Sequence, residues 1–176
     1  MPEPRQGRDR ARRLCVPEDE PMASILAVDL GLRTGLAFYG PDARLVWYRS
    51  QHYASRTSLR RGVHGLLDAC PDVSHLVLEG GGPIADIWVR EAGRRGLSVR
   101  QIAAEDWRRR FFDPKDQRDR DRSKLSADVL ARRIIEWSGA PRPTSLRHDA
   151  AEAILIGLWG VLEVGWLEKV PDGILA

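Results

Sequence analysis

Four acidic side chains stand at places in the sequence where they could do chemistry together. Asp29 and Glu79 each end a short apolar run, and Asp149 and Glu152 come at the start of a longer one. A carboxylate that loses water at the edge of a core needs a compensating partner. No Lys or Arg is placed to pair obviously with all four, whereas divalent cations held by oxygen ligands would do so. The set therefore predicts a two-metal site suited to phosphoryl transfer.

The first part of the chain predicts three strands and a helix. β-rich runs at 24–29, 35–39 and 44–48 are joined by short connections that contain Gly, Pro or Asp, which predicts an antiparallel meander. Apolar residues then recur at helical spacing over 58–70, and Pro71 ends that segment.

The middle of the chain predicts a strand at 75–79, a helix at 84–95 and a strand at 97–102, followed by helices and loops. A strand, helix, strand connection of this length implies parallel pairing with a right-handed crossover. If the strand at 75–79 lies beside the first strand and parallel to it, Asp29 and Glu79 become neighbours. They would then lie at the edge where open α/β sheets bind ligands.

The last predicted helix carries the other two acids. It is apolar nearly all round from 150 to 162, as expected of a helix packed on a sheet. Asp149 and Glu152 are three residues apart, hence on one face, and would be aimed at the strand ends. The expected fold class is therefore α/β, with a five-stranded mixed sheet, three strands antiparallel and two parallel, flanked by helices.

Length and composition bound the class of protein. The chain of 176 residues suits one domain, expected at 22–176, and the segment 1–21, rich in Pro, Arg and Glu, predicts a disordered leader. Cys15 and Cys70 are too few for a disulfide framework or a zinc site, which favours a cytoplasmic protein. No uninterrupted apolar stretch is long enough to cross a membrane. A net charge of +3 with 25 arginines suits a polyanionic partner, although a GC-rich genome would give the same bias.

Three stretches of the sequence resemble the RuvC family of Holliday junction resolvases, within the RNase H-like superfamily of nucleases. Residues 25–37 resemble the family's first acidic strand and the turn after it, and 76–79 resemble the second acidic strand. Residues 148–153 resemble the closing helix, where the family has an Asp or a His, two small residues and then an Asp. The resemblance covers roughly 24–162 and implies an RNase H-like fold.

The resemblance also implies a mechanism and a partner. Asp29 would bridge two Mg²⁺ ions, Glu79 would bind one of them, and Asp149 and Glu152 would complete the shells, with Mn²⁺ able to substitute. A metal-activated water would then attack a phosphodiester. Because a four-way DNA junction needs two matched incisions, a twofold homodimer is expected, with the helix at 84–95 as its interface.

Basic residues gather between 107 and 124, where the resemblance places a DNA-binding loop and the start of a basic helix. Phosphate contacts by such residues would give an affinity that falls with salt. The alternative is a solvated charged loop. Among the tryptophans, Trp107 is the one expected nearest to DNA. The residues expected to bind DNA are Arg108, Arg110, Lys115, Arg118, Arg120, Arg122 and Lys124.

One departure from the family concerns the device that opens the junction. Where the bacterial resolvases carry an aromatic wedge three residues after the second acid, this chain has Gly-Gly-Gly-Pro at 80–83. Ile84 and Trp88 are candidate replacements, and the Gly-rich turn would also let backbone approach DNA closely. The departure fits a divergent relative of bacterial or phage origin.

Each acid also has an ordinary structural explanation. Asp29 could be a turn residue, Glu79 a charge at a loop entry, and Asp149 and Glu152 acids that complement a helix dipole. One shared site explains all four at once. Two functional alternatives stay open: an RNase H-like nuclease acting on another branched DNA or an RNA-containing substrate, and a catalytically silent nucleic-acid-binding member of the superfamily. An actin-like ATPase would need a much longer chain.

Overall fold

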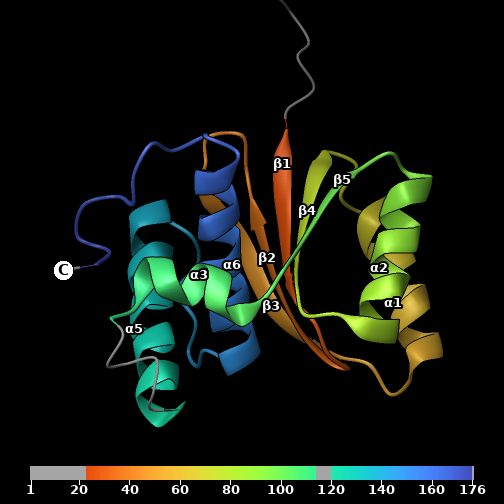
Figure 1. Cartoon of the computed structure of the whole chain (residues 1–176), viewed down its shortest axis with the longest axis horizontal. Helices are drawn as coiled ribbons and strands as arrows, with labels where there is room; N and C mark the ends of the chain where they lie inside the picture. The colour runs from red at the N-terminus through yellow and green to blue at the C-terminus, as the bar shows by residue number, and fades with distance from the viewer. Residues whose placement is uncertain (1–22, 114–119, 176) are drawn as a thin grey trace, which may run out of the picture.

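The computed structural model describes residues 23–113 and 120–175, so the leader predicted at 1–21 lies outside the described residues (Figure 1). Five strands form one sheet in the order β3-β2-β1-β4-β5. Their bounds are β1 (Ser24–Asp29), β2 (Arg33–Tyr39), β3 (Leu45–His52), β4 (Val73–Glu79) and β5 (Ser98–Ile102).

The pairing of the strands confirms the predicted mixed sheet. β2 runs antiparallel to both β1 and β3, while β4 is parallel to β1 and β5 is parallel to β4. In the register of β1 and β4, Asp29 stands directly beside Glu79. In the register of β1 and β2, Asp29 stands opposite Gly35. The central strand β1 therefore ends with a carboxylate that has another carboxylate on one side and a glycine on the other.

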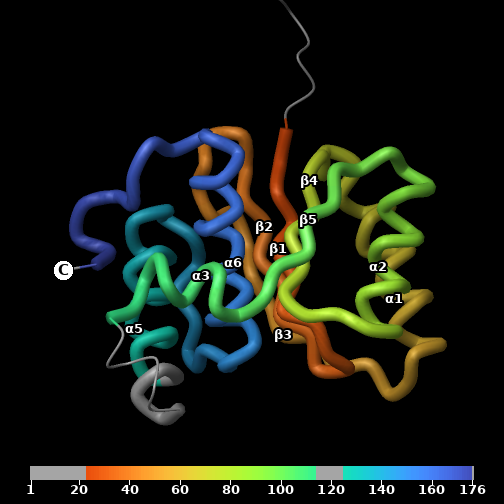
Figure 2. The backbone as a smooth tube through the Cα atoms, in the orientation of Figure 1, coloured from red at the N-terminus to blue at the C-terminus, as the bar shows by residue number. Residues whose placement is uncertain are grey.

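Helices cover both faces of the sheet. Figures 1 and 2 show α1 and α2 on one side and α3, α5 and α6 on the other. The two cores alternate along β1, since Ile25 and Ala27 belong to the core under α6 whereas Leu26 and Val28 belong to the core under α1 and α2. The bounds of the described helices are α1 (Arg56–Asp68), α2 (Gly82–Arg94), α3 (Ala104–Phe111), α5 (Arg120–Ser138) and α6 (His148–Glu163).

Local capping accounts for one difference from the predicted bounds. The apolar spacing places a helix at 58–70, but α1 begins at Arg56. Ser55 is its N-cap, because the Ser55 side chain accepts a hydrogen bond from the Ser58 backbone and the Ser58 side chain accepts one from the Ser55 backbone. This reciprocal capping box satisfies amide groups that the first helical turn leaves open.

Helix α6 lies directly against the sheet, and every residue from Asp149 to Leu162 is buried. Two glycines on its sheet-facing side permit the close approach: a Cβ at Gly157 would overlap the ring of Tyr39, and a Cβ at Gly160 would lie 2.9 Å from a Val77 methyl. The Tyr39 hydroxyl donates to the Ile154 carbonyl at 2.7 Å. These contacts fix the height of α6 above the strands.

A third glycine fixes the start of α6. A Cβ at Gly35 on β2 would overlap the backbone carbonyl of Asp149. Because Gly35 also pairs with Asp29, the first turn of α6 is held beside the end of β1. The segment 104–163, expected as helices and loops, thus supplies the layer that brings the remaining acids to the sheet edge. In the described part of the chain, no helix has the length and apolar character needed to cross a membrane.

Candidate metal centre

The four predicted acids converge at one edge of the sheet. Strand pairing places Asp29 beside Glu79, and the contact of Gly35 with α6 brings Asp149 and Glu152 to the same place. The pKa of Asp29 is raised to about 8, first because its carboxyl is buried and then because Glu152, Glu79 and Asp149 repel its charge. Three elements far apart in the sequence therefore form one acidic cluster, in which the other three acids all act on Asp29.

A tryptophan holds the second acid of the cluster. The Trp107 indole Nε1 donates to Glu79 Oε2 at 2.5 Å. Burial raises the pKa of Glu79, while this hydrogen bond opposes the rise. Trp107 is completely buried and packs edge to face on Phe112, with the ring centroids 5.5 Å apart. Trp107, the tryptophan expected nearest to DNA, is therefore a core residue whose single donor points at a carboxylate of the cluster, and its contact with DNA stays a prediction.

The two acids on α6 also have partners. The Ser50 hydroxyl on β3 donates to Asp149 Oδ2, and Ser50 stands beside Gly35 in the register of β2 and β3. Glu152 accepts from Arg108 Nη2 at 2.9 Å and lies 3.5 Å from His148 Nε2. Sequence reasoning missed Ser50 and the role of Trp107. Strand register would have pointed to Ser50, since β3 passes the same edge on the other side of β2.

Helix α3 carries two of these partners into the site. It begins right after β5, whose last residue, Ile102, pairs with Glu79. The Asp106 carboxylate accepts from the Ala103 amide at 2.8 Å, which satisfies a backbone donor where the helix starts. Trp107 and Arg108 follow immediately and therefore lie over the ends of β1 and β4. The position of α3 decides which side chains reach the acids.

The donor set fits hard divalent cations. Four carboxylates share a partly buried edge, and one of them, Asp29, is pushed toward neutrality by the others. Mg²⁺ binds carboxylate oxygens and would remove that repulsion. In the described residues, no three His, Cys, Asp or Glu side chains already stand where they could hold a metal ion. Glu79 and Glu152 instead each give one carboxylate oxygen to another partner, Trp107 and Arg108.

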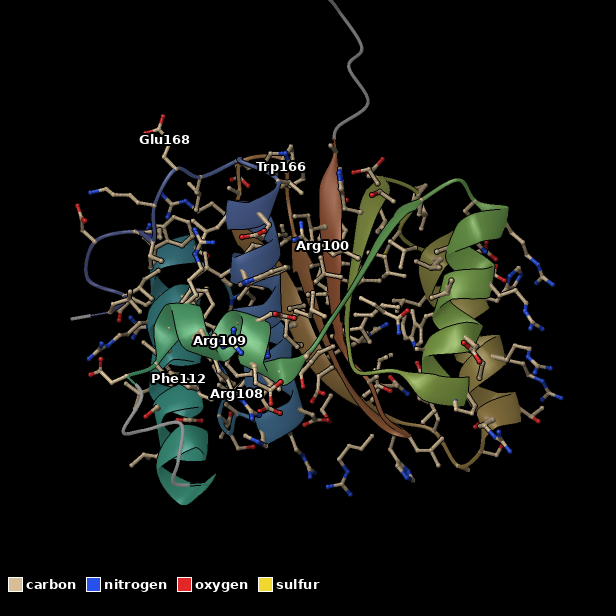
Figure 3. The ribbon with its side chains drawn as sticks, viewed as in Figure 1. Arg100, Arg108, Arg109, Phe112, Trp166 and Glu168 are labelled. Carbon is tan, nitrogen blue, oxygen red and sulfur yellow. The ribbon has the colours of Figure 1, made fainter. Side chains whose placement is uncertain are left out.

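The residues predicted to bind DNA divide into three groups. Arg108 lies in the acidic cluster, and Arg110 pairs with Glu163 at 2.9 Å; Figure 3 shows Arg108 and Arg109 on α3. Lys115 and Arg118 fall outside the described residues. The backbone of α5 begins at Arg120 and includes Arg122 and Lys124, whose side chains are likewise not described. The guanidinium groups of Arg108 and Arg110 both face carboxylates, and their contacts with DNA stay predictions.

The turn after Glu79 is built on glycines with positive φ angles. Gly80 has a φ of 109° and Gly82 a φ of 71°, conformations that glycine adopts without strain. Trp88 is completely buried in the core under α1 and α2, so its proposed use as a wedge was wrong. Ile84 is partly buried and packs against that same core.

The raised pKa of Asp29 predicts how the metal-free protein responds to pH. Between 3.8, the ordinary pKa of Asp, and about 8, its pKa in the fold, the folded chain holds a proton that the unfolded chain has lost. The folded state binds more protons, so the free energy of unfolding falls as pH rises through this interval. The slope contributed by this one group is at most about 1.4 kcal/mol per pH unit, and it vanishes above pH 8.

Urea denaturation in EDTA would measure this effect in the wild type and in Asp29→Asn. We expect the variant to gain stability relative to the wild type as pH rises toward 8. Asp86→Asn, which alters an exposed acid on α2, should track the wild type throughout. A stability difference between Asp29→Asn and the wild type that does not change with pH would show that Asp29 titrates normally.

Comparison with known proteins identifies the fold. The sequence matches no protein-family model and no curated protein. Among solved structures, Thermus thermophilus RuvC is similar over 80% of this chain and 95% of its own, with 13% identity and a TM-score of 0.56. T. thermophilus RuvC in complex with a Holliday junction substrate is similar over 81% and 96%, with 15% identity and a TM-score of 0.54. The chain therefore has the RuvC type of RNase H-like fold.

Proposed function

We propose that this protein is a divalent-metal-dependent nuclease that cuts branched DNA at the acidic cluster. The observation that carries the proposal is the convergence of Asp29, Glu79, Asp149 and Glu152 from β1, β4 and α6 on one sheet edge. The RuvC fold supports it, since one structure with that fold is a complex with a Holliday junction substrate. The four-way junction is therefore the first substrate to test.

The side chains would divide the work as follows. Asp29, whose carboxyl feels the charges of the three other acids, would contact both ions, Glu79 would hold one, and Asp149 and Glu152 would complete the ligand sets. Bound Mg²⁺ or Mn²⁺ would supply activation of water and neutralise charge on the phosphodiester. Ser50 would hold Asp149, and Trp107 would hold Glu79, each through a single hydrogen bond that fixes the orientation of a ligand.

The proposal includes a twofold homodimer, because the two strands of a junction must be cut at matched positions. Helix α2 is the proposed interface, and Val89 on it is 37% exposed. Arg90 and Arg94 are exposed on the same helix, so association through α2 would place arginines of two chains near each other. We therefore expect the dimer to be strengthened by salt or by bound DNA.

A second substrate is favoured by the turn at 80–83. The turn holds no aromatic residue and Trp88 is buried, so this part of the described structure offers no aromatic wedge of the kind expected of a bacterial junction resolvase. A flap, which already presents an opened strand, would need no wedge, and neither would an RNA–DNA hybrid, which has no junction to open. This alternative keeps the metal chemistry and changes the nucleic acid.

Cleavage of labelled substrates would test the proposal. We expect Mg²⁺ or Mn²⁺ to permit cutting of a four-way junction in preference to linear duplex, and EDTA to abolish it. Preference for a flap or an RNA–DNA hybrid would select the second substrate. Binding of these nucleic acids without cutting of any, in either metal, would show a catalytically silent binding protein.

A further inference from the structure

The acidic cluster contains its own cation. Arg108 on α3 donates to Glu152 at 2.9 Å, and its charge also acts on Asp29 and Glu79, where it partly opposes the rise of both pKa values. Three of the four proposed ligands therefore interact with one guanidinium. An arginine does not lose its proton in proteins, so this compensation persists at every pH at which the protein is folded.

The Arg108 guanidinium also lies over the ring of Trp107. Its central carbon lies 5.1 Å from the centroid of the Trp107 ring, a cation–π contact with a side chain that is completely buried. Trp107 in turn holds Glu79. Two consecutive residues of α3 thus contact two different acids: the Trp107 indole donates to Glu79, and the Arg108 guanidinium pairs with Glu152.

This arrangement conflicts with metal binding at Glu152. The negative charge of Glu152 is already compensated by Arg108, and a guanidinium close to the cluster repels a second cation. The Arg108 side chain is 33% exposed whereas that of Glu152 is 12% exposed. Arg108 therefore has solvent into which it can swing, and Glu152 does not.

We infer that Arg108 is an internal counter-ion that stabilises the metal-free site and must leave Glu152 when a divalent cation binds. The inference rests on the proposed function and adds a regulation of the same site: loading of metal is an exchange of one positive charge for another. The apparent metal affinity is then lowered by the free energy of the Arg108–Glu152 pair. Removing the arginine should tighten metal binding and weaken the metal-free fold, opposite effects that a merely structural ion pair would not produce.

A calorimetric titration with Mn²⁺ alone, carried out above pH 8, would test the inference without any cleavage assay. We expect Arg108→Gln to bind Mn²⁺ about tenfold more tightly than the wild type, and to melt at a lower temperature in EDTA. The Mn²⁺ affinity of Arg108→Lys should lie between those of the wild type and Arg108→Gln, because lysine keeps the charge and loses the forked guanidinium. Arg109→Gln, an exposed neighbour on the same helix, is the matched control and should bind as the wild type does.

The outcomes separate this inference from the proposed function. Equal or weaker Mn²⁺ binding by Arg108→Gln, with wild-type binding that is lost in Asp29→Asn, overturns the inference and leaves the metal site standing. No Mn²⁺ binding by either the wild type or Arg108→Gln overturns both. Binding by Arg108→Gln when the wild type shows none supports the inference in its strongest form, because the arginine then excludes the ion altogether.

Discussion

Asp29→Asn is expected to abolish DNA cleavage while leaving the fold and DNA binding intact. The amide has the shape of the carboxyl and none of its charge, so it cannot replace an anionic ligand between two cations. A metal ion contributes several kcal/mol to phosphoryl transfer, which corresponds to a loss in kcat on the order of 10³ or more. The structure adds that the variant should be at least as stable as the wild type without metal at neutral pH, because the carboxyl lies buried among three like charges.

Cleavage rates in Mg²⁺, junction binding by gel shift and melting temperature in EDTA would together check this expectation. Asp86→Asn on α2 provides the control, since it removes an exposed acid that is not among the charges raising the pKa of Asp29. Wild-type cutting by Asp29→Asn would refute the assignment of the site. Loss of cutting together with a lower melting temperature would instead indicate damage to the fold.

Gly35→Ala is expected to destabilise the protein by about 3 kcal/mol or more. The added methyl would overlap the Asp149 carbonyl, which is backbone and cannot rotate away. Helix α6 would have to lift from the sheet, although Gly157 and Gly160 hold it close farther along. Asp149 and Glu152 would move with it, so metal binding should also weaken.

Gly65→Ala on α1 is the matched control for this experiment. A Cβ there meets nothing within 4 Å, and alanine favours a helix over glycine by up to about 1 kcal/mol. Urea denaturation should therefore show opposite signs for the two substitutions. A Gly35→Ala protein with wild-type stability and wild-type Mn²⁺ affinity would show that the contact with Asp149 does not position α6.

The sheet and its acidic edge follow from the sequence because they depend on local patterns and one topological rule. Apolar runs that end in Asp29 and Glu79 predict strands, and the right-handed crossover between parallel strands places those ends together. The spacing of Asp149 and Glu152 on an apolar helix predicts one acidic face in the same way. Each of these inferences needs only residues that are close in the sequence, plus the order of the elements.

The partners of the acids do not follow from such patterns. Arg108 falls in a basic segment, and the sequence groups it with residues expected to bind DNA, whereas the structure turns it toward Glu152. Trp107 was associated with DNA because of its basic neighbours in the chain, whereas its position in the structure is set by where the capped helix α3 begins. The exact start of a helix decides which way each of its side chains points, and a shift of one residue would move the side chain by about 100° around the axis. Contacts between distant elements are sensitive to that shift.

The enclosure of α6 has a consequence for how the site would fail. Asp149 and Glu152 belong to the part of α6 that is buried without a break from Asp149 to Leu162, so their spacing depends on the packing of this helix against the sheet. Local opening, the usual route by which loops lose their function before the rest of a protein does, would have to lift that packed helix to part the two carboxylates. The two carboxylates keep their spacing while α6 stays packed on the sheet, and they lose it when that packing is lost.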